Sequence, residues 1–287
     1  MSKDKKISGN EIVRFSLDIW EETGLLTHQP HSAGRFYFSE RFSEREFNFF
    51  MPDFNQKALS ASTLADISKF YASRHNEPLI YCPDKMVERL GDAVGEGKIR
   101  EVIMRANVDE VLERLADKTP SEKLVLGKMN DFSNPAYLGV YNSVFLSADS
   151  TSQYDKIYET FIDLFGNAAK GGASFSPWVM LGTLDGEAAS AATIVPKGPL
   201  AGLYNLATKP ECRGQGLAAQ VMREAFRQAR DAGATTLFLI TEWSDPKKTE
   251  TGLALEKAET ELELEKMYTR MGFKTFARYS GVMLNPV

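Results

Sequence analysis

The chain has 287 residues, 43% of them hydrophobic and 25% charged, a composition that is typical of globular proteins and favours two modest domains. Its formal net charge of -5 offers no basic surface for phosphates, so we expect no nucleic-acid partner. No apolar leader follows Met1 and no run of about 20 apolar residues occurs, which predicts no membrane span and a cytoplasmic location. The two cysteines, Cys82 and Cys212, lack a paired spacing and fit reduced thiols.

The first domain is predicted to span residues 1–130 and to have an α/β fold. Ser62 has the chemistry of a helix N-cap, apolar residues recur at helical spacing after it, and Pro78 ends the helix. No glycine-rich turn leads into a helix here, so we expect no phosphate-binding turn in this domain. Residues 117–135 carry polar residues and proline and are the predicted junction. The predicted elements are strands at residues 36–38, 47–52 and 79–82 and a helix at residues 62–75.

The second domain is predicted to span residues 131–287, where strands and helices alternate. Asp185 and Gly186 form a hairpin signal of the Asp-Gly type between two apolar runs. Gly233 closes a helix that has an apolar face and an arginine-bearing opposite face. A terminal helix runs into Met271 and precedes two short strands. The other predicted elements are strands at residues 136–146, 178–184, 188–195, 202–208 and 235–241 and helices at residues 152–165 and 217–232.

The most informative motif is the turn that holds Gly214 and Gly216, between a predicted strand and a predicted helix. A helix N-terminus presents N–H groups without internal partners and the positive end of the helix dipole, which favour an anion. Glycines let a diphosphate approach the backbone, and Arg213 can add a charge-assisted hydrogen bond. A Gly-x-Gly pair by itself more often forms only a tight turn. Two rival phosphate motifs fail, because no Gly-Lys-Ser/Thr occurs and Ala219 replaces the third glycine of a dinucleotide fingerprint.

The residues around this turn, NLATKPECRGQGLA at 205–218, resemble the GNAT N-acetyltransferase superfamily, as does MYTRMGF at 267–273. The resemblance implies a strongly twisted mixed sheet with flanking helices, in which the strand at 206–208 splays from the next strand. The pantetheine arm of acetyl-coenzyme A would pair with that strand, and the turn would bind the pyrophosphate. Glu211 departs from the Gln or Arg that often begins the family's motif, which implies weaker binding. The implied donor-binding residues are Leu206, Ala207, Thr208, Arg213, Gly214, Gln215, Gly216, Leu217, Ala218 and Ala219.

The same resemblance implies that an amine attacks the thioester carbonyl directly, without an acyl-enzyme. All three histidines lie in the first half, so the second half lacks the imidazole of a Ser-His or Cys-His nucleophile. Tyr268 matches the position whose phenol protonates the leaving sulfur, and its alternative role is that of a boundary tyrosine packed on the core. Glu242 is the first choice for the proton acceptor, with a water chain as the alternative. The backbone N–H of Leu206 would be the oxyanion donor.

The expected function is therefore transfer of an acetyl group from acetyl-coenzyme A to a primary amine of a small molecule or peptide. The alternatives are a non-catalytic acyl-coenzyme-A sensor and a structural module. His28 and His31 lack further ligands nearby, so we expect no metal. Residues 244–260 exceed the family's usual connection and form either a helical extension or an exposed arm. The helix and strand at residues 62–81 faintly resemble the degenerate first half of tandem members. The acceptor, the acyl-chain length and the oligomeric state are not set by any motif.

Overall fold

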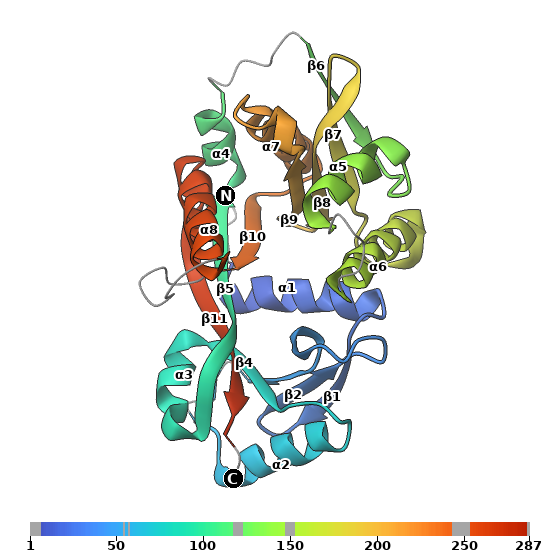
Figure 1. Cartoon of the computed structure of the whole chain (residues 1–287). Helices are drawn as coiled ribbons and strands as arrows, with labels where there is room; N and C mark the ends of the chain where they lie inside the picture. Colours follow the sequence, from blue (N-terminus) through green and yellow to red (C-terminus); the bar gives the residue numbers. More distant parts are fainter. Residues whose placement is uncertain are drawn as a thin grey trace. The chain divides into compact units, whose positions relative to one another are not determined.

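The computed structural model describes residues 7–53, 55–56, 58–116, 123–146, 153–242 and 253–285. The chain forms two compact units, each built from segments that are distant in the sequence. Unit 1 comprises residues 1–104, 240–267 and 275–287, and unit 2 comprises residues 105–239 and 268–274. Helices and strands alternate in both units, so the predicted mixed α/β fold is confirmed (Figure 1).

Unit 1 begins with a helix that the sequence caps strongly. The Ser8 side chain accepts a hydrogen bond from the backbone N–H of Glu11, and the Glu11 carboxylate accepts one from the N–H of Ser8, which forms a capping box. Most of β5 (Val94–Asn107), α8 (Leu253–Arg270) and β11 (Lys274–Leu284) also belong to this unit. Its other main elements are α1 (Gly9–Glu22), β1 (Thr27–His31), β2 (Gly34–Phe38), β3 (Phe49–Pro52), α2 (Ala61–Ala72), β4 (Leu79–Pro83) and α3 (Asp84–Leu90).

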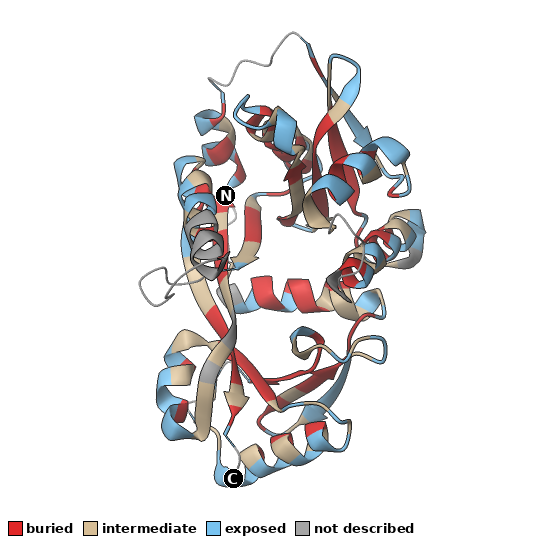
Figure 2. Ribbon diagram, viewed as in Figure 1, coloured by how far each residue is buried: buried red, intermediate tan, exposed pale blue. Residues whose placement is uncertain are grey.

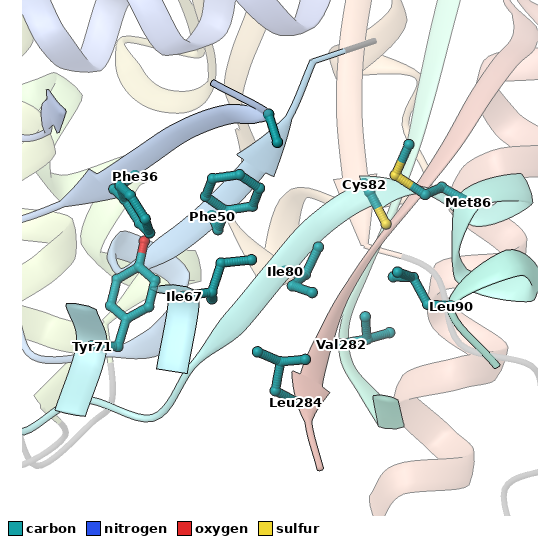
Figure 3. Packing of buried hydrophobic residues seen from close by; sticks show 11 residues of the cluster. Phe36, Phe50, Ile67, Tyr71, Ile80, Cys82, Met86, Leu90, Val282 and Leu284 are labelled. Carbon is teal, nitrogen blue, oxygen red and sulfur yellow. The ribbon is translucent and has the colours of Figure 1, made fainter. Parts of the chain in front are cut away.

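The sheet of unit 1 combines an antiparallel meander with a parallel strand. Strands β1, β2 and β3 pair in antiparallel order, and β3 pairs in parallel with β4 through Phe50 and Ile80. Strand β11 then pairs with β4 in antiparallel order, and α2 contributes Ile67 and Tyr71 to the core while its outer face is exposed (Figure 2). One core cluster of this unit consists of Ala33, Phe36, Phe50, Ile67, Tyr71, Ile80, Cys82, Met86, Leu90, Val282 and Leu284 (Figure 3).

Unit 2 contains the second run of helices and strands. Strands β6 to β9 pair as consecutive antiparallel neighbours, and β9 pairs in parallel with β10. The elements are α4 (Val108–Arg114), β6 (Leu124–Met129), α5 (Pro135–Phe145), α6 (Gln153–Asn167), β7 (Trp178–Leu184), β8 (Glu187–Lys197), β9 (Leu200–Thr208), α7 (Leu217–Asp231) and β10 (Thr236–Glu242), whose last three residues fall in unit 1.

Helices α5 and α7 cover opposite faces of the sheet in unit 2. The Tyr137 hydroxyl of α5 lies 3.2 Å from the Thr193 hydroxyl of β8, whereas a Cβ at Gly182 of β7 would meet Val221 of α7. Val179 pairs with Thr193 and lies three residues from Gly182 on the same strand. Because side chains alternate along a strand, the two contacts are on opposite faces.

Three expectations from the sequence differ from the structure. Residues 136–145 of the predicted strand 136–146 are helical, because Asn134 caps the amides of Ala136 and Tyr137 and Pro135 occupies the first helical turn. The chain end forms one long strand, β11, because its pairing with β4 is continuous from Tyr279 to Met283. Strand β6 lies inside the stretch predicted as a domain junction and pairs with β7 along its whole length.

Candidate functional site

The turn between β9 and α7 is open on its outer side. Arg213, Gly214, Gln215 and Gly216 are all exposed. Gly214 has φ +77° and Gly216 has φ +73°, a left-handed region that glycine adopts without steric strain. A Cβ built on either glycine would meet no heavy atom within 4 Å. The turn therefore needs glycine for its backbone conformation and leaves space for a ligand.

The N-terminus of α7 has no side-chain cap. Gly216 is the N-cap residue and has no side chain to accept a hydrogen bond from the first turn of the helix. The buried side chain of Leu217 packs with Leu124 and Ala189, which anchors the helix start to the sheet. Arg213 is held at the turn because its Nε donates to the Thr208 carbonyl at 3.3 Å. Unsatisfied amides, the helix dipole and a neighbouring guanidinium are three features that favour the binding of an anion.

Strands β9 and β10 are paired over only a short length. Their parallel pairs run from Leu200 with Thr236 to Gly202 with Phe238, although both strands continue well beyond these residues. On its other side β9 stays paired with β8 as far as Thr208. The backbone of β9 after Gly202 therefore has one edge without a β10 partner, and an extended ligand can pair with such an edge.

The other predicted donor-binding residues lie around the end of β9 and the start of α7. Leu206 and Thr208 are half-buried, and Ala207 is buried. The Ser190 hydroxyl on β8 donates to the Ala207 carbonyl and lies 2.8 Å from the Thr208 hydroxyl, which fixes the strand end. Ala218 is half-buried and Ala219 is buried in the first turn of α7. Unit 2 thus brings all ten predicted residues into one strand–turn–helix segment.

Tyr268 occupies the last turn of α8 and belongs to unit 2. The side chain is 8% exposed, and burial raises the pKa of its phenol to about 12. Its ring contacts Phe273 with centroids 5.9 Å apart, and Phe273 in turn contacts Phe226 of α7 at 6.0 Å. Within the described residues its hydroxyl forms no hydrogen bond. A phenol that stays protonated at neutral pH and has no competing partner can act as a proton donor.

Glu242 is exposed at the end of β10 and lies in unit 1, near a carboxylate that the sequence did not indicate. Glu101 of β5 accepts a short hydrogen bond from the Tyr81 hydroxyl. Burial and the negative charge of Glu242 raise the pKa of Glu101, whereas the Tyr81 hydrogen bond lowers it. Glu101 sits in a stretch whose secondary structure the sequence left open, and only the pairing of strands brings it to Tyr81 and Glu242.

His28 and His31 each lie beside one carboxylate. His28 Nδ1 lies 2.7 Å from a Glu21 carboxylate oxygen, and His31 Nε2 lies 3.4 Å from an Asp66 oxygen. In the part of the chain that the structure describes, no group of three or more His, Cys, Asp or Glu side chains could hold a metal ion. Among the same residues, no helix has both the length and the apolar character needed to cross a membrane.

Part of the insertion noted in the sequence also has a described structure. Helix α8 begins at Leu253, so the end of the 244–260 segment is helical. Its earlier residues, 244–252, lie outside the described residues.

The sequence of this region matches a family model. Residues 139–249 match the Acetyltransferase (GNAT) family, a span that includes β9, the glycine turn and α7. A comparison with curated protein sequences gave no match.

Solved structures resemble the chain over most of its length. A GCN5-related N-acetyltransferase from Kribbella flavida has a TM-score of 0.59 and 12% identity, with 96% of this chain and 95% of that chain covered. A GCN5-related N-acetyltransferase from Sphaerobacter thermophilus has a TM-score of 0.57 and 12% identity, with 99% and 89% covered. A tandem GNAT protein from the clavulanic acid biosynthesis pathway has a TM-score of 0.58 and 10% identity, with 89% and 80% covered. At these identities the likeness establishes the fold.

Proposed function

We propose that this chain moves an acetyl group from acetyl-coenzyme A to a primary amine, because residues 139–249 match the Acetyltransferase (GNAT) family model, which supports acyl transfer in general. The observation that carries the proposal is the open, uncapped glycine turn at the start of α7. The acceptor would be a small molecule or a peptide, and the protein would act in the cytoplasm, where both free cysteines stay reduced.

The donor would bind along β9 and the turn. The pyrophosphate would accept hydrogen bonds from the amides of the Gly214–Gly216 turn and the first turn of α7, with Arg213 as an added cation. The pantetheine arm would pair with the edge of β9 after Gly202, which β10 leaves unpaired. Glu211 is exposed and adds a negative charge beside the turn, which weakens but does not block the binding of phosphate.

The chemical step would be a direct transfer. The amine nitrogen attacks the thioester carbonyl carbon, the C–S bond breaks, and the oxygen develops negative charge that the Leu206 N–H stabilises. Tyr268 gives its phenolic proton to the departing sulfur, and the amine gives up one proton to a carboxylate or water. Glu242 is our candidate for that acceptor. Positioning and electrostatics supply the rate enhancement, because no covalent acyl-enzyme is needed.

The proposal also assigns different roles to the two halves of the chain. Residues 131–287 would form the transferase domain, and residues 1–130 a degenerate GNAT-like domain without its own donor site. The order of elements supports this, because α1–β1–β2–β3–α2–β4–α3–β5 and α6–β7–β8–β9–α7–β10–α8–β11 follow the same pattern. In both runs the third strand of the meander pairs in parallel with the strand after the next helix.

The test combines binding with turnover. Calorimetry with coenzyme A measures whether the turn binds the donor, and release of free thiol from acetyl-coenzyme A in a panel of alkylamines, amino acids and lysine peptides measures transfer. We expect binding and amine-dependent thiol release. Binding without release for any amine would favour an acyl-coenzyme-A sensor, and no binding would reject both functions.

A further inference from the structure

Asn205 has a backbone conformation that is unusual for a residue within a strand. Three non-glycine residues have positive φ in the described part of the chain: His75 at +60°, Asp185 at +51° and Asn205 at +49°. His75 and Asp185 lie in turns, whereas Asn205 lies inside β9. Asparagine tolerates this region better than most residues, but it remains unfavourable relative to extended backbone. A left-handed residue inside a strand therefore has a local cause.

This residue coincides with a break in the pairing of β8 and β9. Ala191 pairs with Ala207 and Thr193 pairs with Tyr204, so Asn205 and Leu206 both stand opposite Ala192. Two residues that oppose one form a β-bulge, which bends the strand and re-aims the groups around the extra residue. The bulge therefore sets the direction in which the Leu206 N–H points.

The Tyr137 hydroxyl of α5 lies at this break. It is 3.2 Å from the Thr193 hydroxyl on β8, and both side chains are buried. Burial raises the pKa of the Tyr137 phenol to about 12, and the side chains of Thr193 and then Asn205 lower it. One phenol thus interacts with both strands at the position where their register shifts.

The side-chain amide of Asn205 has a buried N–H group without a hydrogen-bond acceptor within the described residues. Its Nδ2 is buried and makes no hydrogen bond within the described residues, although the Asn205 side chain is close enough to lower the pKa of the Tyr137 phenol. A buried amide without an acceptor is destabilising, and glycine would adopt the same φ without that penalty. The side chain is therefore costly to stability, so this position supplies the bulge chiefly with its positive φ and, to a lesser degree, with its interaction with Tyr137.

We propose that Asn205 and Tyr137 are positioning residues that fix the β9 bulge and thereby orient the Leu206 N–H toward the acyl carbonyl. This inference rests on the proposed function, because the Leu206 N–H matters only where an acyl group is transferred. Neither side chain needs to touch the substrate. Helix α5 thus controls the geometry of the transfer from the opposite side of the sheet to α7.

The experiment compares four variants of the full chain. Asn205→Ala strains the left-handed backbone, Asn205→Gly relieves that strain without a side chain, and Tyr137→Phe removes only the hydroxyl. Tyr141→Phe is the matched control, since this buried tyrosine of α5 donates to the Tyr158 carbonyl away from the bulge. For each variant kcat, KM for acetyl-coenzyme A, calorimetric affinity for coenzyme A and melting temperature are measured.

We expect Asn205→Ala to lower kcat at least about tenfold and Tyr137→Phe about threefold, with coenzyme A affinity within about threefold of the unmodified protein. Asn205→Gly should recover most of the kcat lost in Asn205→Ala, and Tyr141→Phe should keep kcat within about twofold. The inference is overturned if Asn205→Gly is as slow as Asn205→Ala, or if Tyr137→Phe behaves like Tyr141→Phe.

A second readout keeps this test separate from that of the proposed function. In deuterated protein labelled with ¹⁵N-leucine, the Leu206 amide resonance should move in Asn205→Ala and Tyr137→Phe and stay in place in Tyr141→Phe. If the unmodified protein turns over no amine while this resonance moves as expected, the proposed function fails, but the inference that Asn205 and Tyr137 fix the bulge stands. An unmoved Leu206 resonance in Asn205→Ala would overturn the inference that this residue fixes the bulge.

Discussion

Helices α2 and α7 begin at equivalent places in the order of strands and helices, but their N-termini are capped differently. Each helix follows the third strand of an antiparallel meander and precedes a strand parallel to it. At α2, the Ser60 side chain accepts the Thr63 N–H at 3.1 Å and also lies 2.8 Å from the Ser62 hydroxyl. At α7, the corresponding N-cap is Gly216, which has no side chain and lies in an exposed turn.

This difference shows that topology alone does not leave a helix start open to a phosphate. A serine cap supplies the acceptor that the first turn of a helix lacks, so an anion gains little by binding there. A glycine cap keeps the amides free while its left-handed φ shapes the turn. The two units can therefore share a strand–helix–strand order while only α7, of these two helices, has a start that is open to an anion.

The largest expected effect comes from placing a carboxylate in the open turn. Gly214→Asp should weaken coenzyme A binding at least about 100-fold, because the carboxylate competes for the amides and repels the diphosphate. Asparagine and aspartate tolerate positive φ, and the space around Gly214 is open, so the fold should persist. Calorimetry gives the affinity.

Gly198→Asp is the control for that change. Gly198 has φ +59° and equally open surroundings in the turn between β8 and β9. Its substitution should leave coenzyme A affinity unchanged. Equal losses in both variants would show that the effect comes from backbone strain and would remove the distinction between the two helix starts.

Removing the phenol of Tyr268 should affect catalysis and not binding. We expect Tyr268→Phe to lower kcat about 100-fold, the scale of a lost general acid, with coenzyme A affinity unchanged. Because burial raises the pKa of Tyr268 to about 12, the phenol stays protonated at any pH well below that value. The rate of the unmodified enzyme should therefore show no loss from this group between about pH 7 and pH 10.

Tyr279→Phe is the matched control for this phenol, since Tyr279 is also buried and its hydroxyl lies 3.4 Å from the Asn10 side-chain oxygen, away from the glycine turn in sequence. Unchanged turnover in Tyr268→Phe would exclude the acid role.

Arg213 should contribute a smaller, salt-dependent share of binding. Arg213→Ala should weaken coenzyme A affinity about three- to tenfold at low salt, and the difference should shrink as ionic strength rises. Arg227→Ala is the comparison, because Arg227 lies on α7, the helix that follows the turn, and pairs with Glu224 at 2.6 Å. Affinity is measured for both variants over a series of salt concentrations. A loss that is the same at all salt concentrations would point to a structural role through the Thr208 carbonyl.

The smallest effect is expected at the N-terminus of α2, which the Ser60 side chain caps. Ser60→Ala should lower the free energy of unfolding by about 1 kcal/mol through loss of the cap, without changing coenzyme A affinity. Ser73→Ala, at the other end of α2, should cost less because the exposed Ser73 hydroxyl only donates to the Phe70 carbonyl. Denaturant unfolding measures both. A change in coenzyme A affinity in Ser60→Ala would mean that the N-terminus of α2 also takes part in donor binding.

Local sequence patterns determined the strand, turn and helix that make up the proposed anion site. The glycines at 214 and 216, the arginine before them and the apolar face after them need only short-range chemistry, so the segment folded as predicted. The same patterns misassigned residues 136–146, because an apolar run there fits either a buried strand or a helix. They also placed the cap of α2 at Ser62, whereas Ser60 provides it.

Tertiary structure decided the rest, since it depends on which strands pair and where their registers break. The bulge at Asn205 exists only because β8 and β9 lose register there, and the Tyr137 hydroxyl reaches it from a helix 68 positions earlier in the chain. The carboxylates of Glu101 and Glu242 are neighbours for the same kind of reason. A pattern along the sequence reports the preferences of a segment, but contacts between distant segments arise only when the whole sheet closes its hydrogen bonds and buries its apolar faces.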